Sequence, residues 1–485
     1  VFPVTYDVCI VGTGAAGITL ALELSAAGQT VLLCEGGGVQ YNVRSQDAYI
    51  GDTSGEPYYP LNTARIRYIG GTTNHWAGMC HPLQPIDFAV RDDLTVPTWP
   101  IAFSDIEPHY LRAGEIAGLP DDPWNFAAIE AEKKMPKIVG DDLGYNASAF
   151  RYPANTKLRE VYFKQLVDTP NITVAVNANF VDVEFGMIND VVSGAKFKNY
   201  AGDVYTARAK SYVVACGGIE NAKLLLNLAS SHTQFLDVAP NIGQYFMEHL
   251  CYYHSAYILT GQAEVDYLAP LISRTPTSNG DYQWVAAPTA EARAQHGIAN
   301  NVSLTLDDIR LNAPDAILGN PVTQGVQSMM KHTKVSGSDQ IIYCYVRAEQ
   351  LPNPESNITL TDAVDAQGLR RVNLNWGFDP RDLESIFASI GLFGQAIAKQ
   401  DLGRVCITPP DGSQWGTIYG GYHHMGTTRM SESPEFGVVD PNCRVHGINN
   451  LYIGGSSVFS TGGWANPTIN VVAFAVRLAE HLKTV

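Results

Sequence analysis

The chain has 485 residues, of which 45% are hydrophobic and 16% charged, a balance typical of globular proteins rather than disordered ones. Its formal charge of -16 argues against nucleic acid and anionic membrane surfaces as partners, and suits an enzyme for a neutral or cationic small molecule. No run of about 18 apolar residues is present, so no transmembrane helix is expected. No signal peptide is visible, which favours the cytoplasm, although the chain starts at Val1 and a processed N-terminus stays open.

The eight cysteines are scattered along the chain. None forms a C-x-x-C pair, which argues against a zinc or iron–sulfur site, and we expect no metal. Cys9, Cys34 and Cys216 lie in apolar, strand-like runs and are expected to be buried as small hydrophobic residues. Reduced thiols agree with a cytoplasmic protein.

Residues 4–35 predict a β-α-β unit with a glycine-rich turn. A strand leads into Gly12-x-Gly14-x-x-Gly17, a helix follows, and a second strand ends at Glu35, which is the dinucleotide-binding fingerprint in its required context. Gly12 permits the tight turn, Gly14 lets the backbone approach a pyrophosphate, and Gly17 lets the helix pack on the strand. The helix N-terminus offers N–H groups to the phosphates. Glu35 is placed to bind a ribose 2′-OH, which favours FAD or NAD over NADP.

A second strand–glycine–helix turn is predicted at residues 216–221. Residues 172–215 alternate as strands before it, and a helical run follows it, as expected when the chain revisits the same sheet. Between the two turns, residues 36–100 are rich in glycine, proline and tyrosine and are predicted to form an extended loop that wraps a ligand.

Residues 250–400 contain strand-like segments followed by a helical pattern, unlike the preceding part of the chain. They predict a second domain, an antiparallel sheet with helices that covers a site. The tail from 451 to 483 has an apolar strand, a glycine turn and a long helix, and is expected to return to the first domain. We therefore predict an α/β fold in which a nucleotide-binding domain, assembled from both chain ends, encloses a substrate domain in sequence. Strands and one helix of that second domain are predicted at 282–287, 340–347, 357–360 and 380–399.

Two glycine-containing segments carry histidines that could contact a cofactor or take part in catalysis. In residues 70–78, His75 has three interpretations: ring packing, hydrogen bonding to a cofactor, or covalent attachment to one. In residues 422–430, one of the adjacent His423 and His424 could serve as a general base, because imidazole titrates near neutral pH. A structural role is the alternative, since a lone histidine is more often structural than catalytic.

A third segment joins a glycine turn at 454–457 to a helix that starts at Pro467. Proline is favourable in the first helical turn, and Asn466 before it is a natural N-cap. The functional alternative is that the Asn466 amide hydrogen-bonds a substrate oxygen.

Together these motifs resemble the glucose–methanol–choline (GMC) flavoprotein oxidoreductase family, in particular its sugar-oxidising branch, which includes pyranose 2-oxidase and FAD-dependent sugar dehydrogenases. The likeness spans nearly the whole chain and is densest at 4–90, 210–250 and 418–485. Further matching segments are 241–249, 347–354 and 440–445.

The resemblance implies an FAD-binding Rossmann-like domain at 1–245, with the wrapping loop at 36–100, a substrate domain with a mostly antiparallel sheet at 246–410, and a return at 411–485. It places the catalytic roles on His423 and Asn466, and it leaves open whether His75 is bonded covalently to the flavin. Candidate substrate contacts are Glu349, Gln350 and His424; for the first two, a polar strand end is the alternative. The expected cofactor contacts are Gly12, Gly14, Ala15, Ala16, Gly17, Glu35, Gly36, Arg65, Gly70, Gly71, Thr72, Asn74, His75, Trp76, Ala77, Gly78, Val181, Cys216, Gly217, Asn221, Gly455, Ser456, Asn466, Pro467 and Thr468.

The activity implied is oxidation of a hydroxyl of a sugar, glycoside or related polyol to a carbonyl by hydride transfer to flavin N5, with His423 as the base. Oxygen, a quinone or another acceptor would reoxidise the flavin, and the chain is expected to be a monomer or homo-oligomer. The alternatives are a non-redox lyase that keeps FAD, an NAD-dependent dehydrogenase, and a flavin-binding scaffold without catalysis. The sugar and the carbon oxidised stay open.

Overall fold

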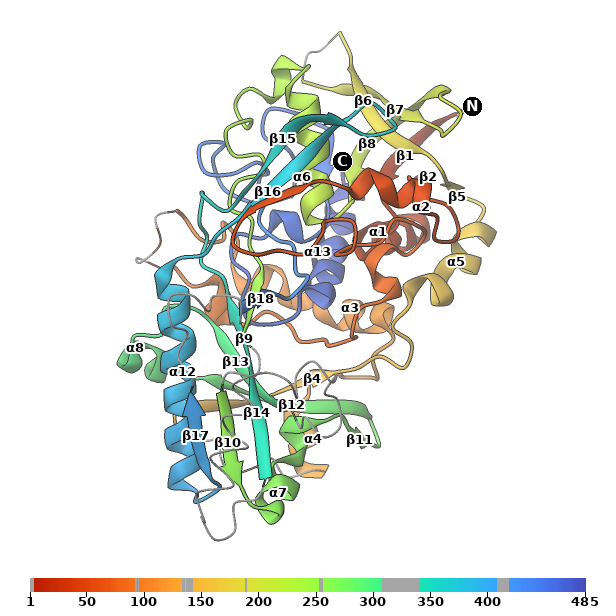
Figure 1. Ribbon diagram of the computed structural model, residues 1–485. Helices are drawn as coiled ribbons and strands as arrows, with labels where there is room; N and C mark the ends of the chain where they lie inside the picture. The colour runs from red at the N-terminus through yellow and green to blue at the C-terminus, as the bar shows by residue number, and fades with distance from the viewer. Residues whose placement is uncertain are drawn as a thin grey trace.

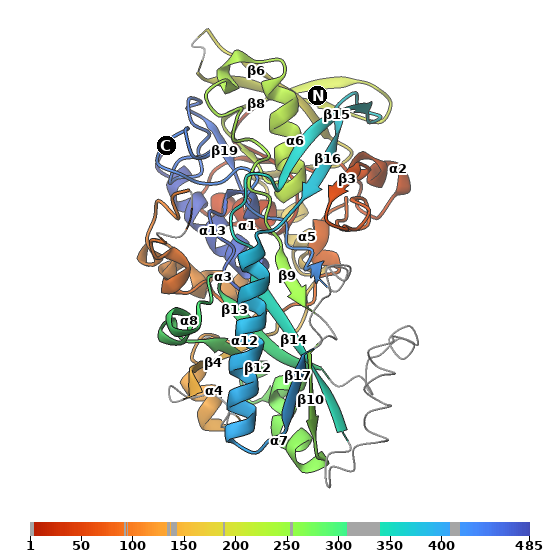
Figure 2. The ribbon, with the colours of Figure 1, turned by 60° about the vertical axis from the view of Figure 1, so that its left-hand side comes forward.

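The computed structural model describes residues 4–485 except 92–93, 95, 133–135, 137–142, 188–189, 253–255, 308–339 and 408–417. Two large sheets organise these residues: a seven-stranded sheet in the upper part of Figure 1, near both chain ends, and a nine-stranded sheet in the lower part. A three-stranded sheet lies beside helix α6 of the upper part (Figure 2). The predicted α/β fold, with a mostly antiparallel second sheet, is confirmed.

The seven-stranded sheet has the order β5-β2-β1-β8-β7-β6, with β19 also paired to β8. Strands β5, β2, β1, β8 and β19 are parallel, whereas β7 runs antiparallel to both β8 and β6. The central strands are almost wholly buried, as expected for a parallel sheet covered on both faces. Its strands are β1 (Thr5–Val11), β2 (Val31–Cys34), β5 (Ile172–Ala175), β6 (Asn179–Phe185), β7 (Val192–Lys198), β8 (Val204–Val214) and β19 (Leu451–Ile453).

The first and last long helices pack against each other on this sheet, because α1 follows β1 directly and α13 follows β19. The chain ends therefore build one unit, as the return of the tail predicted. Its helices are α1 (Ala15–Ala26), α2 (Val43–Gln46), α3 (Tyr110–Ala117), α5 (Leu158–Asp168), α6 (Gly218–Ala229) and α13 (Pro467–Leu482). Short 3₁₀ turns occur at η1 (Asp47–Tyr49), η2 (Gly71–Asn74), η3 (Pro85–Phe88), η4 (Phe103–Asp105), η5 (Glu107–His109), η7 (Thr233–Phe235) and η9 (Ser456–Val458).

The nine-stranded sheet is antiparallel at each of its pairings. One of its strands, β4, comes from before residue 246 and pairs with β12 along its whole length, so this sheet draws on the range expected for the cofactor domain. The strands are β4 (Tyr145–Arg151), β9 (His249–Tyr252), β10 (Ala256–Thr260), β11 (Thr275–Thr277), β12 (Gly280–Pro288), β13 (Val302–Asp307), β14 (Gln340–Glu349), β17 (Arg404–Ile407) and β18 (Ile418–Gly420).

Helix α12 (Pro380–Lys399) runs along this sheet and has the bounds predicted for it (Figure 2). Its N-terminus is fixed by a capping box, in which the Asp379 side chain accepts from Arg381 N–H at 2.9 Å and Asp382 accepts from Asp379 N–H at 2.8 Å. The shorter helices near the sheet are α4 (Phe126–Glu132), α7 (Gln262–Ile272) and α8 (Ala290–His296).

The three-stranded sheet is formed by β3 (Asp52–Gly55), β15 (Asn357–Val364) and β16 (Arg370–Trp376). β15 and β16 form a hairpin that packs on α6, and β3 belongs to the loop that was predicted to wrap a ligand. This sheet therefore ties the wrapping loop to the helix that follows the second glycine turn.

Two further findings concern the described residues as a set. Within these ranges, no helix is long and apolar enough to cross a membrane. Cys216 is a free thiol of intermediate exposure, and the buried free thiols are Cys9, Cys34, Cys80, Cys251, Cys344 and Cys443.

Candidate active site

A cavity of about 670 Å³ lies at the carboxyl ends of the parallel strands and reaches the nine-stranded sheet. Its wall comes from the turn after β1, the end of β2, the wrapping loop, the turn after β8 and the start of α13. Strand β14 and residues 421–424 close the other end. The carboxyl ends of parallel strands are where open α/β sheets bind ligands.

The first glycine turn has the shape that a pyrophosphate requires. Gly12 has φ +105, and a Cβ there would lie 2.5 Å from the carbonyl oxygen of Ala215. A Cβ on Gly17 would lie 1.9 Å from the carbonyl oxygen of Gly12, so this glycine serves packing of α1 on the turn. A Cβ on Gly14 would meet nothing within 4 Å, so the space beside it is open to a ligand.

Glu35 lies at the end of β2 with its carboxylate oriented by three protein donors. It accepts from the Thr13 hydroxyl at 2.5 Å, from Thr13 N–H at 3.2 Å and from Gly37 N–H at 2.9 Å. Each carboxylate oxygen accepts more than one hydrogen bond, so Glu35 keeps capacity for a ribose hydroxyl in the cavity that it lines.

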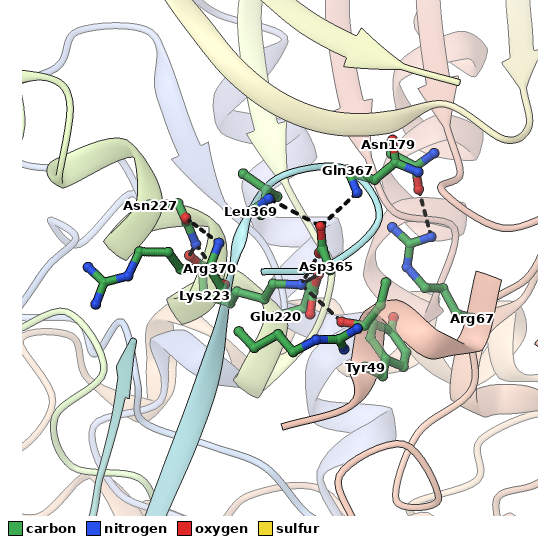
Figure 3. Close-up of polar contacts among 12 residues, drawn as sticks. Tyr49, Arg67, Asn179, Glu220, Lys223, Asn227, Asp365, Gln367, Leu369 and Arg370 are labelled. Carbon is green, nitrogen blue, oxygen red and sulfur yellow. Dashed lines mark hydrogen bonds and ion pairs between the residues drawn. The ribbon is translucent and has the colours of Figure 1, made fainter. Parts of the chain in front are cut away.

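A buried ionic network that includes Glu220 supports the cavity wall (Figure 3). Arg65 and Glu220, which both line the cavity, are 3.2 Å apart, and Lys223 lies 3.4 Å from Glu220 and 2.8 Å from Asp365. Lys223 also donates to the carbonyl oxygen of Ala48 at 3.0 Å. The network thereby joins the wrapping loop, α6 and the loop of the β15–β16 hairpin behind one wall.

The opposite end gathers His423, His424 and Asn466 on the cavity wall. The Asn466 amide nitrogen lies 3.2 Å from Nε2 of His423, and Nδ1 of His423 lies 2.7 Å from Nδ1 of His249. Burial and the neighbouring His249, Arg347 and His424 hold the pKa of His423 well below its usual value. His423 is therefore neutral at neutral pH and can accept a proton.

Asn466 occupies the N-cap position of α13, but its side chain makes no capping bond. Its Oδ1 is buried without a hydrogen-bond partner, and so is Nε2 of His424. Buried polar atoms are normally paired, so these two atoms at the cavity wall suit a bound ligand. The site thus fits a dinucleotide along the glycine turn and a small hydroxylated molecule beside His423.

Glu248 packs behind the two histidines. Its carboxyl accepts from His423 N–H at 2.7 Å and from the hydroxyl of Tyr58, and lies 3.7 Å from Nε2 of His424. Burial is the main cause that raises the pKa of Glu248 to about 7. This carboxyl therefore changes charge near neutral pH, beside the residue expected to act as base.

Most of the residues expected at the site meet in this one cavity. Those on its wall are Gly12, Gly14, Ala15, Ala16, Glu35, Gly36, Arg65, Gly71, Thr72, His75, Trp76, Ala77, Cys216, Gly217, His423, His424, Gly455, Ser456, Asn466, Pro467 and Thr468. Those away from the wall are Gly17, Gly70, Asn74, Gly78, Val181, Asn221, Glu349 and Gln350.

Several of the latter hold the wall in place from behind. Asn221 accepts from Cys216 N–H at 2.8 Å and donates to Gly454 at 3.1 Å and Ser457 at 2.8 Å, so it ties two glycine turns together. Asn74 donates within its own loop, to the carbonyl oxygens of Ile69 and Gly71.

Val181, which was expected to contact the cofactor, lies one residue along the strand from a position that lines the cavity. Ala178 and Phe180 line the cavity instead. Successive side chains of a strand point to opposite faces, so a register error of one residue turns the side chain away.

Glu349 and Gln350 are wholly buried and bonded to protein rather than exposed to the cavity. Glu349 accepts from Arg91 at 2.9 Å and from the backbone N–H groups of Gly462 and Gly463. Gln350 accepts from Glu248 N–H at 3.0 Å, so both residues support the segments that carry His423 and Asn466.

Sequence reasoning assigned no site role to Tyr345, Arg347 or His249. Tyr345 and Arg347 alternate along the predicted strand at 340–347, so they share a face, but nothing local shows that this face meets the cavity. Arg347 is 3% exposed, and its Nε has no hydrogen-bond partner. Among the described residues, no Asp or Glu forms an ion pair with its guanidinium.

Comparison with known proteins agrees with this geometry. A family model described as GMC oxidoreductase matches residues 352–475. The chain is 25% identical to 6'''-hydroxyparomomycin C oxidase of Streptomyces lividus, over 98% of this chain and 92% of that protein. It is 24% identical to 2-methyl-1,2-propanediol dehydrogenase of Mycolicibacterium austroafricanum, over 98% and 95%. The chain is thus similar to GMC oxidoreductases, with the match to the family model confined to residues 352–475.

The fold of the chain also matches a solved structure. A crystal structure of formate oxidase aligns with a TM-score of 0.62 and 17% identity, over 99% of this chain and 98% of that one. GMC oxidoreductases use FAD, as the resemblance implied, and the chain is an FAD-dependent oxidoreductase.

Proposed function

We propose that this protein oxidises a hydroxyl of a sugar, glycoside or related polyol to a carbonyl. The observation that carries the proposal is the pairing of a neutral imidazole with an amide, 3.2 Å apart, on the wall of a cavity that begins at a dinucleotide-binding turn. The two relatives described above are an oxidase named for 6'''-hydroxyparomomycin C and a dehydrogenase named for 2-methyl-1,2-propanediol, which supports a hydroxylated substrate.

The chain offers separate contacts for each part of FAD. The N–H groups at the start of α1 would bind the pyrophosphate beside Gly14, and Glu35 would bind the ribose of the adenosine half. Ser456 and the N-terminus of α13 at Pro467 and Thr468 would contact the isoalloxazine end. When bound, FAD supplies the acceptor for the hydride that leaves the substrate carbon.

His423 would serve as the general base at Nε2, because its lowered pKa keeps the imidazole neutral. The substrate O–H bond breaks as the proton passes to this nitrogen. Asn466 would hold the same oxygen through its amide, which fixes the direction of the C–H bond. Tyr345, Arg347 and His424 line the same end and would contact the rest of the substrate.

His75 is exposed and lines the cavity, which is compatible with either a covalent or a non-covalent contact to flavin. Precipitation of the holoenzyme with acid tests the link, because a covalently bound flavin stays with the denatured protein. The matched control is His75→Gln, which would release all its flavin. Yellow supernatant from the unaltered protein would show that FAD is held without a covalent bond.

The test of the function is anaerobic titration of the flavin-loaded enzyme with a panel of sugars, glycosides and diols. We expect one class to bleach the flavin absorbance, and readmitted air to show whether oxygen restores it. Failure of the whole panel to reduce a fully loaded enzyme would contradict the proposal and favour a non-redox lyase.

A further inference from the structure

A second histidine lies directly behind His423. His249 begins β9, is wholly buried, and lies outside the cavity wall. Its Nδ1 is 2.7 Å from Nδ1 of His423, and its Nε2 is 2.7 Å from the carbonyl oxygen of Gly463. The two rings meet edge to face, with centroids 4.8 Å apart and planes at 83°.

The carbonyl of Gly463 decides where the ring protons lie. A carbonyl oxygen only accepts, so Nε2 of His249 must carry the hydrogen of that contact. Burial holds the pKa of His249 at about 4, so its ring has a single proton at neutral pH and its Nδ1 is bare. A 2.7 Å contact between two ring nitrogens needs one hydrogen, and it can come only from Nδ1 of His423.

Neutral His423 then has its lone pair on Nε2, the nitrogen beside the Asn466 amide. We infer that His249, itself held by the Gly463 carbonyl, is a positioning residue that fixes His423 in the tautomer whose Nε2 accepts the substrate proton. This inference rests on the proposed role of His423. It assigns a purpose to a buried polar contact that takes no part in binding FAD or substrate.

The charged groups around the pair come from the neighbouring strand and loop. Arg347 of β14 lowers the pKa of both histidines, Glu349 of the same strand raises that of His249, and His424 lowers that of His423. Because burial is the largest influence on both pKa values and lowers them, both rings are neutral at neutral pH.

When Nε2 of His423 gains the substrate proton, the ring becomes an imidazolium and its Nδ1–H bond to His249 becomes charge-assisted. The chain of hydrogen bonds ends at a carbonyl oxygen, which does not take up a proton at ordinary pH. The proton therefore stays on the histidine pair, facing the cavity.

Two substitutions separate the two bonds of His249. In His249→Asn the amide oxygen lies near the position of Nδ1, so it still accepts from His423 and the bond to Gly463 is lost. In His249→Gln the amide lies near the position of Nε2, so the bond to Gly463 remains and Nδ1 of His423 loses its acceptor. The control is His81→Gln, because His81 is equally buried, has both ring nitrogens bonded and does not contact His423.

We expect anaerobic flavin reduction to slow about 10²-fold or more in His249→Gln and less than about 10-fold in His249→Asn, at equal FAD content. A purely structural role predicts the reverse order, since glutamine fills more of the space left by the ring. Equal rates in the two variants, or a faster His249→Gln, would overturn the inference.

Nitrogen-15 NMR of the histidine-labelled holoenzyme, with the flavin oxidised and no substrate added, tests the tautomer without turnover. His423 should show a protonated Nδ1 and a bare Nε2, and His249 the opposite; the variants His423→Gln and His249→Gln assign the signals. A protonated Nε2 on His423 would overturn the inference even if the enzyme oxidises alcohols. If no alcohol reduces the flavin but the predicted tautomers are seen, the proposed function fails and the assigned tautomer stands.

Discussion

The two ends of the cavity are built in different ways. At the nucleotide end, Gly12, Gly14, Gly17 and Glu35 lie within one β-α-β unit, and their task is set by backbone shape. At the end proposed to be catalytic, the side chains come from four distant segments, and their task is set by side-chain contacts. These residues are His249, Arg347, His423 and Asn466. A change at the first end should therefore alter how much FAD is bound, and a change at the second should alter the rate of each bound flavin.

The largest effect that would test this contrast is expected for His423→Ala. The variant should keep FAD, because the glycine turn and Glu35 belong to the β1–α1–β2 unit and not to the segment that carries His423. It should slow flavin reduction on the order of 10⁴-fold, equivalent to about 5 kcal/mol. Stopped-flow absorbance under anaerobic conditions measures the rate, and the protein-to-flavin absorbance ratio measures FAD content. Unchanged reduction would refute the base, and loss of FAD would break the contrast between the ends.

The same contrast explains how much the sequence could predict. The seven-stranded sheet, its first glycine turn and helix α12 were predictable because hydrophobic period, glycine spacing and a capping box are local signals. His423 and Asn466 came from resemblance to a family, and the structure places them 3.2 Å apart. No local pattern would have joined them, since 43 residues separate them in the chain.

The residues that sequence reasoning misplaced or missed share one cause. Val181 lies on the face of its strand that does not line the cavity. The Glu349 carboxylate accepts hydrogen bonds from backbone N–H groups of a loop more than 100 residues later in the chain. His249 acquires its role only when β9 meets residues 421–424. These contacts depend on the register and pairing of strands that are remote in sequence, which a single sequence does not specify.

The second prediction sharpens the contrast at the buried ionic network around Glu220. Lys223 is 1% exposed and is the cation between Asp365 and Glu220 (Figure 3). Lys223→Met would leave the buried Asp365 carboxylate without its cation, whereas Glu220 keeps Arg65. We expect a cost of about 4 kcal/mol in the free energy of unfolding and a lower FAD content. Chemical unfolding and the flavin absorbance ratio measure the two effects, while the reduction rate per bound flavin should stay close to that of the unaltered enzyme.

The matched control is Lys196→Met. Lys196 pairs with Asp182 at 3.0 Å, but both side chains are about one-third exposed, so its removal should cost less than about 1 kcal/mol. A double variant with Asp365→Leu should recover part of the stability lost with Lys223, because it removes one unpaired charge. A slower reduction rate in Lys223→Met at full FAD occupancy would show that the two ends are coupled.

The smallest expected effect concerns Glu248, at the catalytic end. Burial raises its pKa from 4.5 to about 7 in the folded chain, so the folded state holds a proton that the unfolded state releases. The stability that this group contributes is complete below pH 4.5 and is lost as the pH rises to about 7, by about 3 kcal/mol in total. Glu248→Gln keeps an acceptor for His423 N–H and a donor for Tyr58 but lacks the titration.

Burial also raises the pKa of Asp87 to about 7 and that of Asp382 to about 8. Both groups are present in the unaltered chain and in Glu248→Gln, so the difference in unfolding free energy between the two proteins reports the titration of Glu248 alone. Unfolding of the holoenzymes at pH 5 and pH 8 should show Glu248→Gln gaining on the unaltered chain by about 2–3 kcal/mol at the higher pH. Parallel pH dependence would mean that the carboxyl ionises near its ordinary pKa. The charge beside His423 would then be fixed across neutral pH, and any change of reduction rate in that range would have to come from another group at the catalytic end.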